Sequence, residues 1–420
     1  MELFSEKSAA LSGSLAAPPS KSITHRALLF GLMSGGRMEI DHPLLSDDTE
    51  STLAATVLMG AEVKRGKTLS IESDMHQASD VINARNSGTT ARLTSSICAL
   101  TDGYAVITGD DSLRRRPMGP IMDAVRQLGG TAFSTLGNDR LPAVFGGKLK
   151  REYATIRGDI SSQFASSLAM SCPLKSGSTE IEIEGGIQSE RYLALTLEMV
   201  KYFGGEARLE SNSLFFKGDG AYRPRNISIP GDYSSAAFML AAAAVTGGTL
   251  SVSNLSDTFT QADASIAGTL RLFGCKVTER SGSLTVESGR LTSADIDCSQ
   301  CPDLFPVLCV VASFAGGEST VRGSMNLRLK ETDRIETTSM MLKSMGVRFS
   351  GEGETLRIRG GPVRGGVVES HGDHRIAMAA CVAGLSSEKG VRVNGAECFS
   401  VSYPGFVEDI RAAGGMVTLK

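Results

Sequence analysis

The strongest constraint on the fold of this chain is a pattern that recurs six times along its 420 residues, about every 70 residues. Small polar or charged residues are followed by an apolar stretch rich in Ala and Leu, and then by Gly. Between the copies lie a second, amphipathic helical segment that ends in Gly and short β-branched runs typical of strands. The six copies are Pro19–Gly36, Asn86–Gly103, Asp159–Gly177, Asp232–Gly248, Cys301–Gly317 and Gly372–Ser387. They predict six strand–helix–strand–helix–strand units.

Six such units do not suit a helical solenoid, because each unit is too long and too rich in strands. Two domains of three units each fit the length better. The pattern is weakest at Gly218–Asp232, which contains two prolines and little apolar content. We interpret that segment as a crossing between domains.

Composition narrows the function classes. A net charge of −3 at pH 7 and a hydrophobic share of 41% predict a soluble protein with no general affinity for nucleic acids or membranes. The eight cysteines are scattered, mostly in apolar stretches, which is typical of reduced thiols in a cytoplasmic protein. Cys298 and Cys301 form a C-x-x-C pair, but no second pair stands at zinc-site spacing, so we expect no metal.

The start of each buried helix could bind an anion, because helix N-termini offer unpaired N–H groups and a partial positive charge. Ordinary helix capping is the alternative at any single start. Recurrence favours binding, since the first three starts are polar and two of them cationic. The residues are Lys21, Ser22, Thr24 and Arg26 in the first, Gly88, Thr89 and Arg92 in the second, and Ser161, Ser162 and Gln163 in the third.

Three further segments gather charge at predicted helix starts. "LRRRPMGP" precedes a proline-initiated helix and is typical of a solvated loop or, less often, of a nucleic-acid-binding arm. The absence of aromatic residues weakens the nucleic-acid interpretation. "GDHRIAMAA" puts Asp373, His374 and Arg375 at the start of a strongly apolar helix, a position that favours groups facing a cleft. For the histidine, a capping or buried core role is as plausible as a role in a site. "KETDR" places Lys330 and Glu331 in a turn before a helix that Asp333 would cap.

Common catalytic motifs do not explain these groups. The sequence contains no G-x-x-x-x-G-K-S/T phosphate loop, no H-E-x-x-H and no G-x-S-x-G. ATP, zinc and acyl-serine chemistry are therefore disfavoured.

Taken in order, eight segments resemble the 5-enolpyruvylshikimate-3-phosphate synthase family, a branch of the enolpyruvyl transferases. They are "SKSITHRAL", "NSGTTARL", "RRPMGP", "SSQF", "QSERY", "CPDLFP", "NLRLKETDRIE" and "GDHRIAMA". The resemblance implies an α/β (α+β) fold of two domains, a two-domain inverse α/β barrel in which each domain has three βαβαββ units. It implies domain I at residues 1–14 and 226–420, domain II at 15–225, and ligands in the cleft between them.

The resemblance also implies an activity. The family transfers the enolpyruvyl (1-carboxyvinyl) group of phosphoenolpyruvate to the 5-hydroxyl of shikimate 3-phosphate and releases phosphate. This is the sixth step of the shikimate pathway to chorismate and aromatic amino acids, and the family is the target of glyphosate. We therefore expect a cytoplasmic monomer that needs no cofactor and binds small-molecule substrates, without nucleic acid or membrane.

Site residues follow by position from the family motifs. The expected catalytic residues are Asp303, a base for the 5-hydroxyl, Glu331, a partner for the carbon 3 proton, and Lys21, a second acid–base candidate. For shikimate 3-phosphate they are Lys21, Ser22, Arg26, Ser161, Ser162, Gln163, Ser189, Tyr192, Asp303, Asn326 and Lys330. For phosphoenolpyruvate they are Lys21, Gly88, Arg116, Gln163, Arg334 and Arg375.

Two positions depart from the family pattern. Val401 stands where the family often has a lysine that faces phosphoenolpyruvate, and Glu190-Arg191 replace a common Lys-Pro pair beside Ser189. Gly88 matches relatives that glyphosate inhibits.

Two alternatives remain open at this stage. One is the sister transferase that acts on UDP-N-acetylglucosamine, which typically has a cysteine before its Arg-Pro; "DDSLRRRP" has none. The other is a non-catalytic binder of anions or RNA ends on the same scaffold, which would not need the carboxylates Asp303 and Glu331.

Overall fold

The computed structural model describes residues 1–66 and 68–420, which divide into two compact units. Unit 1 contains residues 1–18 and 230–420, and unit 2 contains residues 19–229. Within the described residues the strands form six four-stranded sheets, three in each unit.

Unit 2 holds the sheets β14-β3-β5-β4, β6-β7-β9-β8 and β10-β11-β13-β12. Its strands are β3 (Gly36–Asp41), β4 (Ala61–Arg65), β5 (Thr68–Ser73), β6 (Ile82–Asn83), β7 (Tyr104–Thr108), β8 (Thr131–Ser134), β9 (Ala143–Gly146), β10 (Tyr153–Arg157), β11 (Thr179–Glu184), β12 (Ala207–Glu210), β13 (Ser213–Phe216) and β14 (Ile227–Ser228). Its helices are α1 (Lys21–Met33), α2 (Asp47–Leu58), α3 (Gly88–Cys98), α4 (Gly119–Gln127), α5 (Ser162–Ser171) and α6 (Glu190–Tyr202).

Unit 1 holds the sheets β16-β17-β15-β2, β18-β19-β21-β20 and β22-β23-β1-β24. Its strands are β1 (Glu2–Glu6), β2 (Ser12–Ala16), β15 (Thr249–Ser253), β16 (Lys276–Arg280), β17 (Ser283–Glu287), β18 (Asp295–Asp297), β19 (Glu318–Arg322), β20 (Arg348–Glu352), β21 (Thr355–Arg359), β22 (Gly366–Glu369), β23 (Val391–Asn394) and β24 (Met416–Leu419). Its helices are α7 (Tyr233–Thr246), α8 (Ile266–Leu272), α9 (Phe305–Phe314), α10 (Arg334–Ser344), α11 (His374–Gly384) and α12 (Phe406–Ala412).

Each sheet repeats one pairing scheme. In β10-β11-β13-β12 the edge strand β10 is parallel to β11, and the remaining neighbours are antiparallel. The chain order β10-α5-β11-α6-β12-β13 is thus a βαβαββ unit, which confirms the predicted α/β fold with six like-built units.

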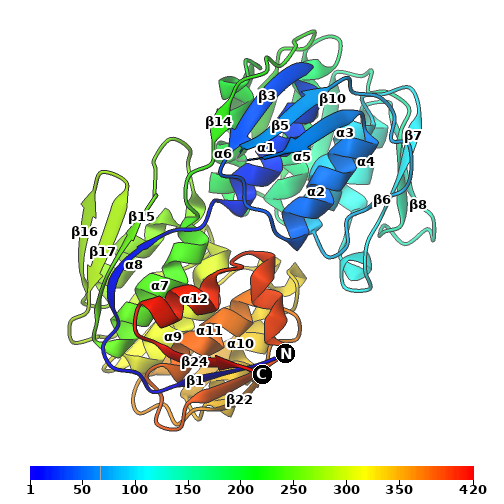
Figure 1. Cartoon of the computed structure of the whole chain (residues 1–420). Coiled ribbons are helices and arrows are strands. Elements are labelled where there is room, and N and C mark those ends of the chain that lie inside the picture. The colour runs from blue at the N-terminus through cyan, green and yellow to red at the C-terminus, as the bar shows by residue number, and fades with distance from the viewer. Residues whose placement is uncertain (67) are drawn as a thin grey trace. The chain divides into compact units, whose positions relative to one another are not determined.

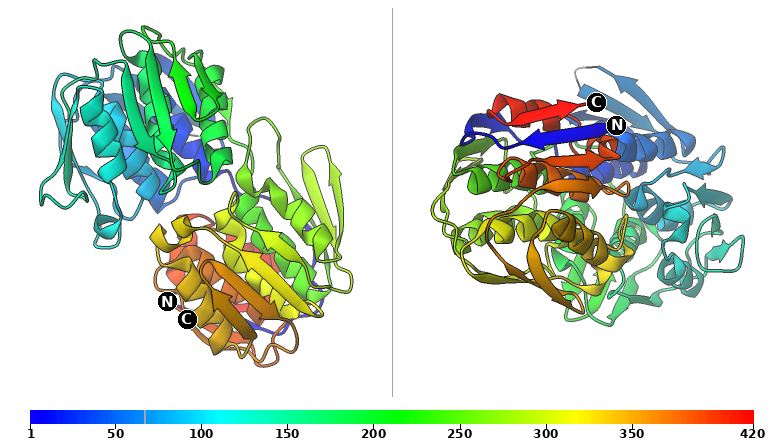
Figure 2. Two further views of the ribbon diagram at one scale, coloured as in Figure 1. Left: turned by 180° about the vertical axis from the view of Figure 1, so that it is seen from behind. Right: turned by 90° about the horizontal axis from the view of Figure 1, so that it is seen from below.

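The chain passes from unit 1 to unit 2 just after β2 and returns to unit 1 just after β14. β2 follows β1 but pairs in parallel with β15 of unit 1, whereas β14, just before α7, pairs in parallel with β3 of unit 2. The sheet of the last βαβαββ repeat includes the N-terminal strand β1. Because β1 pairs antiparallel with β24, the N- and C-termini lie close together (Figures 1 and 2).

The first helix of each repeat is buried on nearly all sides, while the second has an exposed face. α7, α9 and α11 contact one another, and almost every residue in them is buried. The Ala-rich sequences of α7 and α11 allow this close approach, and the apolar content of all three helices explains why they form the core of unit 1. The polar residues that precede these helices therefore lie at the edge of an apolar core.

The structure also bears on membrane insertion. Among the described residues, no helix combines the length and apolar content required to span a bilayer.

We predict opposite stability effects for two Gly-to-Ala changes. Gly60 has φ +104° and an added Cβ would lie 2.3 Å from the Asp74 carbonyl oxygen, so Gly60→Ala is expected to lower the free energy of unfolding by at least about 2 kcal/mol. Gly268 lies within α8 with no atom within 4 Å of an added Cβ, so Gly268→Ala should raise it by about 0.5–1 kcal/mol. Urea denaturation measures both, and a stabilising Gly60→Ala would contradict the backbone geometry.

Candidate active site

In unit 1 the carboxylate of Asp303 lies among three cations. Arg334 Nη1 donates to Asp303 Oδ1 at 2.7 Å, and Arg375 Nη2 donates to Asp303 Oδ2 at 2.9 Å. The Lys330 ammonium lies 3.6 Å from Oδ1. The short helix Pro302–Leu304 carries Asp303 at its second residue.

Arg334 is the most completely paired of these cations. Its side chain is 1% exposed, and its Nε and Nη2 donate to the two oxygens of Asp373 at 2.8 and 3.2 Å. Nη2 also donates to Glu331 Oε2 at 2.6 Å. Burial alone would lower the pKa of Arg334, but Asp373, Glu331 and Asp303 together raise it. Arg334 is therefore a fixed positive charge shared by three carboxylates.

Local sequence places these groups as predicted. Asp333 caps α10 and accepts from the N–H groups of Ile335 and Glu336 at 3.1 Å, so Arg334 falls in the first turn. Asp373 caps α11 in the same way, accepting from the Arg375 N–H at 2.9 Å. One aspartate thus both starts α11 and pairs with Arg334 on α10, which joins the two helix starts.

Lys330 is the least confined of the cations around Asp303. Its side chain is 28% exposed. Burial lowers the pKa of Lys330, and the neighbouring Arg334 and Arg375 lower it further, whereas Asp303 and Glu331 act in the opposite direction. Asn326, also predicted as a ligand contact, is buried in the preceding 3-10 helix, where its Oδ1 accepts from Ser324 Oγ at 2.7 Å.

In unit 2 the start of α1 pairs with the start of α2. The Lys21 ammonium lies 3.0 Å from Asp48 Oδ2, and both side chains are mostly buried, at 14% and 11% exposed. Ser22 follows in the first turn, and its carbonyl accepts from Arg26 Nη1 at 3.0 Å. Lys21 is thereby held at the first residue of α1.

Arg26 ties α1 to α6. Its side chain is 2% exposed, Nε donates to Thr196 Oγ1 at 2.8 Å, and Nη2 donates to the Tyr192 carbonyl at 3.3 Å. Burial lowers the pKa of Arg26 to about 10, so it stays charged at neutral pH. Ser189 stands immediately before α6 with φ 56°, so both predicted ligand residues of that segment are at one helix start.

The starts of α3 and α5 are linked through Arg92. Its Nη1 donates to Gln163 Oε1 at 2.9 Å and to Ser161 Oγ at 3.3 Å, and its guanidinium lies 5.1 Å from the centre of the Phe164 ring. Gln163 Nε2 donates to Thr89 Oγ1 at 2.9 Å. The predicted residues Ser161 and Gln163 are thus oriented by α3, and Ser162 is buried beside them.

Arg116 approaches the first residue of α3. It is 7% exposed, and its Nη2 donates to Asn86 Oδ1 at 2.7 Å. A Cβ on Gly88 would lie 3.0 Å from Arg116 Nη1, so glycine is what lets this guanidinium come close to the helix start. The structure therefore brings together Gly88 and Arg116, both predicted for phosphoenolpyruvate.

Sequence reasoning missed three of the residues that build these clusters. Asp48 is one of three acidic residues in the first turn of α2, and acidic residues are common at any helix N-terminus. Asp373 was noted but given no role, and its pairing with Arg334 bridges 39 residues. His25 is buried, with Nδ1 2.7 Å from Thr52 Oγ1; burial lowers its pKa well below the usual value, helped by Lys21 and Arg26. Only its place between two cations at a helix start could have signalled this.

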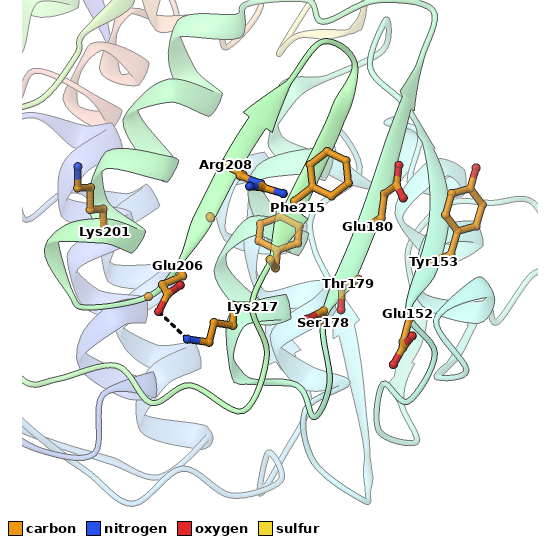
Figure 3. Close-up of a pocket in the computed structure, with 13 residues that line it drawn as sticks. Glu152, Tyr153, Ser178, Thr179, Glu180, Lys201, Glu206, Arg208, Phe215 and Lys217 are labelled. Carbon is orange, nitrogen blue, oxygen red and sulfur yellow. Dashed lines mark hydrogen bonds and ion pairs between the residues drawn. The ribbon is translucent and has the colours of Figure 1, made fainter.

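A hollow of about 890 Å³ lies against the sheet β10-β11-β13-β12 of unit 2 (Figure 3). It is lined by none of the predicted site residues. Among its lining residues Lys217 pairs with Glu206 at 3.2 Å, and Arg208 lies over the Phe215 ring. Because the predicted site residues lie elsewhere, we do not assign the active site to this hollow.

Comparison with known proteins identifies a family. A family model described as EPSP synthase (3-phosphoshikimate 1-carboxyvinyltransferase) matches residues 5–410. A curated 3-phosphoshikimate 1-carboxyvinyltransferase of Methanocella arvoryzae is 43% identical over 413 residues, covering 96% of this chain and 97% of that protein. One of Methanothrix thermoacetophila is 40% identical over 421 residues, covering 99% of both.

The fold agrees with the sequence comparison. A solved structure of an EPSP synthase from Acinetobacter baumannii superposes with a TM-score of 0.83 at 27% identity, covering 100% of this chain and 99% of that one.

We predict that Asp373→Asn lowers the free energy of unfolding by about 3–5 kcal/mol, because it leaves the buried Arg334 charge without its bidentate partner. Asn still caps a helix, so the loss reports the ion pair. Asp333→Asn is the matched control. Asp333 is another helix cap, and its ion pair with Arg328 is about one-third exposed, so we expect a change below about 1 kcal/mol. Equal losses in urea denaturation would contradict the role given to Arg334.

Proposed function

The chain belongs to the EPSP synthase family, and from this premise we propose that it transfers the enolpyruvyl group of phosphoenolpyruvate to the 5-hydroxyl of shikimate 3-phosphate, releasing phosphate. The observation that carries the proposal is the setting of Asp303 and Glu331. Both carboxylates contact one buried arginine, and Asp303 also contacts Lys330 and Arg375. Such a group of cations with embedded carboxylates suits a reaction of anions that requires proton transfer.

The cations account for binding. Phosphate and carboxylate groups form strong, often bidentate hydrogen bonds with arginine. For shikimate 3-phosphate we propose Lys21, Ser22, Arg26, Ser161, Ser162, Gln163, Ser189 and Tyr192 of unit 2 with Asp303, Asn326 and Lys330 of unit 1. For phosphoenolpyruvate we propose Lys21, Gly88, Arg116 and Gln163 of unit 2 with Arg334 and Arg375 of unit 1.

The carboxylates account for the chemistry. Addition requires a proton at carbon 3 of phosphoenolpyruvate while the 5-hydroxyl attacks carbon 2; elimination from the tetrahedral adduct then releases a proton and phosphate. We propose Asp303 as the acceptor of the hydroxyl proton and Glu331 as the group that exchanges the carbon 3 proton, with Lys21 as a further acid. No metal or cofactor enters these steps.

Ligand binding is proposed to prepare Asp303 for this task. Both oxygens of Asp303 accept from guanidinium groups. Four of the five Arg334 N–H groups are occupied by carboxylates. An incoming phosphate or carboxylate must compete with Asp303 for Arg334 and Arg375. Each exchanged hydrogen bond leaves a lone pair on Asp303 able to accept a proton.

The remaining sequence predictions concern the setting of the enzyme. We propose that the two compact units are the two functional domains, that the chain acts as a monomer in the cytoplasm, and that it uses small-molecule substrates without nucleic acid or cofactor. The composition and the charge of −3 support this.

Glu331→Gln is expected to lower the rate of phosphate release by about 10²–10⁴-fold, because an amide cannot exchange the proton. Shikimate 3-phosphate binding, measured by calorimetry, should change little, since the shape is kept. Glu336→Gln is the matched control, five residues away in the first turn of α10 and exposed. Full activity of Glu331→Gln would remove Glu331 from the mechanism. Phosphate release with UDP-N-acetylglucosamine but not with shikimate 3-phosphate would overturn the proposed acceptor.

Gly88→Ala is expected to raise the KM for phosphoenolpyruvate about tenfold and to weaken inhibition by glyphosate, because the added methyl displaces the Arg116 guanidinium. The KM for shikimate 3-phosphate should stay within about twofold, since Arg116 is not among its proposed contacts. Gly268→Ala, which adds a methyl to open space in α8, is the control. Wild-type turnover unaffected by high glyphosate would contradict competition at this position.

A further inference from the structure

Asp263 is a buried carboxyl group that the proposed mechanism does not use. It lies in the 3-10 helix Ala262–Ser265, which packs against α7, and it is 1% exposed. Its Oδ2 accepts a hydrogen bond from the Ser234 hydroxyl near the start of α7. Its Oδ1 is buried and has no hydrogen-bond partner within residues 1–66 and 68–420. An ionised carboxylate with one bare buried oxygen is unfavourable, whereas a protonated one is tolerated.

The surroundings of Asp263 are part of the candidate site. The charged groups that act on it are Asp303 from the 3-10 helix before α9, Arg375 from α11 and Asp232, the cap of α7. The Cys298 thiol, before the same 3-10 helix, also senses its charge. Asp263 is therefore coupled by charge to the proposed base, Asp303, and to one of the proposed phosphoenolpyruvate arginines, Arg375.

A charge count shows what ionisation of Asp263 would do. Lys330, Arg334 and Arg375 balance Asp303, Glu331 and Asp373, three charges of each sign. A negative Asp263 would leave the group with an excess of negative charge and would oppose the binding of an anion to Arg375.

Resting on the proposed function, we propose that Asp263 is a positioning residue that must be neutral in the active enzyme, and that its ionisation weakens phosphoenolpyruvate binding through Arg375 and Asp303. Asp263 acts on these two residues and is not assigned a contact with substrate.

The direction of the pH dependence follows. Burial, assisted by the negative charges of Asp303 and Asp232, raises the pKa of Asp263 to about 7 against the opposing effects of Arg375 and the Ser234 hydroxyl. The neutral form therefore dominates below pH 7 and is lost as the pH rises through about 7. Activity that requires this form must fall on the alkaline side.

Asp263→Asn tests the proposal, because the amide has the same shape and never ionises. At pH 6 we expect kcat/KM for phosphoenolpyruvate within about twofold of wild type, and at pH 8.5 we expect it about fivefold or more above wild type. The gain should be in KM rather than kcat. A purely structural role would lower activity at every pH. Asp257→Asn, an exposed carboxylate in the same segment, should leave the profile unchanged.

Ser234→Ala provides a second, independent variant. Loss of its hydroxyl removes a hydrogen bond that favours ionised Asp263, so the alkaline decline should move to higher pH. Infrared spectroscopy of the free enzyme should show a protonated-carboxyl band that disappears near pH 7 in wild type and at higher pH in Ser234→Ala. This readout does not depend on activity.

Two results would overturn the inference while leaving the proposed function intact: an active wild type whose pH profile coincides with that of Asp263→Asn, or a carboxyl band that Ser234→Ala does not shift. Failure of the wild type to release phosphate from phosphoenolpyruvate and shikimate 3-phosphate at pH 6 would instead remove the proposed function.

Discussion

The buried charge of Arg334 is the constraint on which the organisation of unit 1 depends. A guanidinium that is 1% exposed cannot remain unpaired, because removing a charge from water is costly unless opposite charges replace it. Asp373, Asp303 and Glu331 supply those charges from three different segments. The starts of α10 and α11 and the 3-10 helix before α9 are thereby fixed against one another. A buried network of this kind contributes less to net stability than to a unique geometry, and a unique geometry is what proton transfer requires.

Two buried arginines of unit 2 have neutral contacts instead. Arg26 donates to a threonine hydroxyl and two backbone carbonyls, and the contacts of Arg92 include Ser161 and Gln163. These neutral oxygens accept from the N–H groups without cancelling the positive charge, whereas Lys21 in the same unit pairs with Asp48. The described contacts thus differ between the units: neutral oxygens surround Arg26 in unit 2, whereas three carboxylates surround Arg334 in unit 1.

Much of the fold could be predicted from the sequence, because it depends on short-range sequence patterns. The six repeats, the glycine-terminated helices and the Asp333 cap depend on residues a few positions apart, so short-range patterns predict them. The pairing of Lys21 with Asp48 or of Arg92 with Gln163 joins separate repeats, and no spacing rule specifies it. Asp303 was found through the family resemblance alone, since a single Asp after Pro looks like any helix start. No sequence pattern indicated Asp263, because its raised pKa results mainly from burial in the folded chain.

Val401 is a position of unit 1 where the sequence departs in charge from the family pattern. It closes the 3-10 helix Ala396–Val401, which packs against α11, at the position where the family resemblance leads one to expect a lysine. A lysine there would add one positive charge to the unit that holds the Asp303 cluster. With valine the cluster is balanced, and any further negative charge acts on it directly. The proposed neutrality of Asp263 agrees with this balance, because its ionisation would add one negative charge beside the Asp303 cluster.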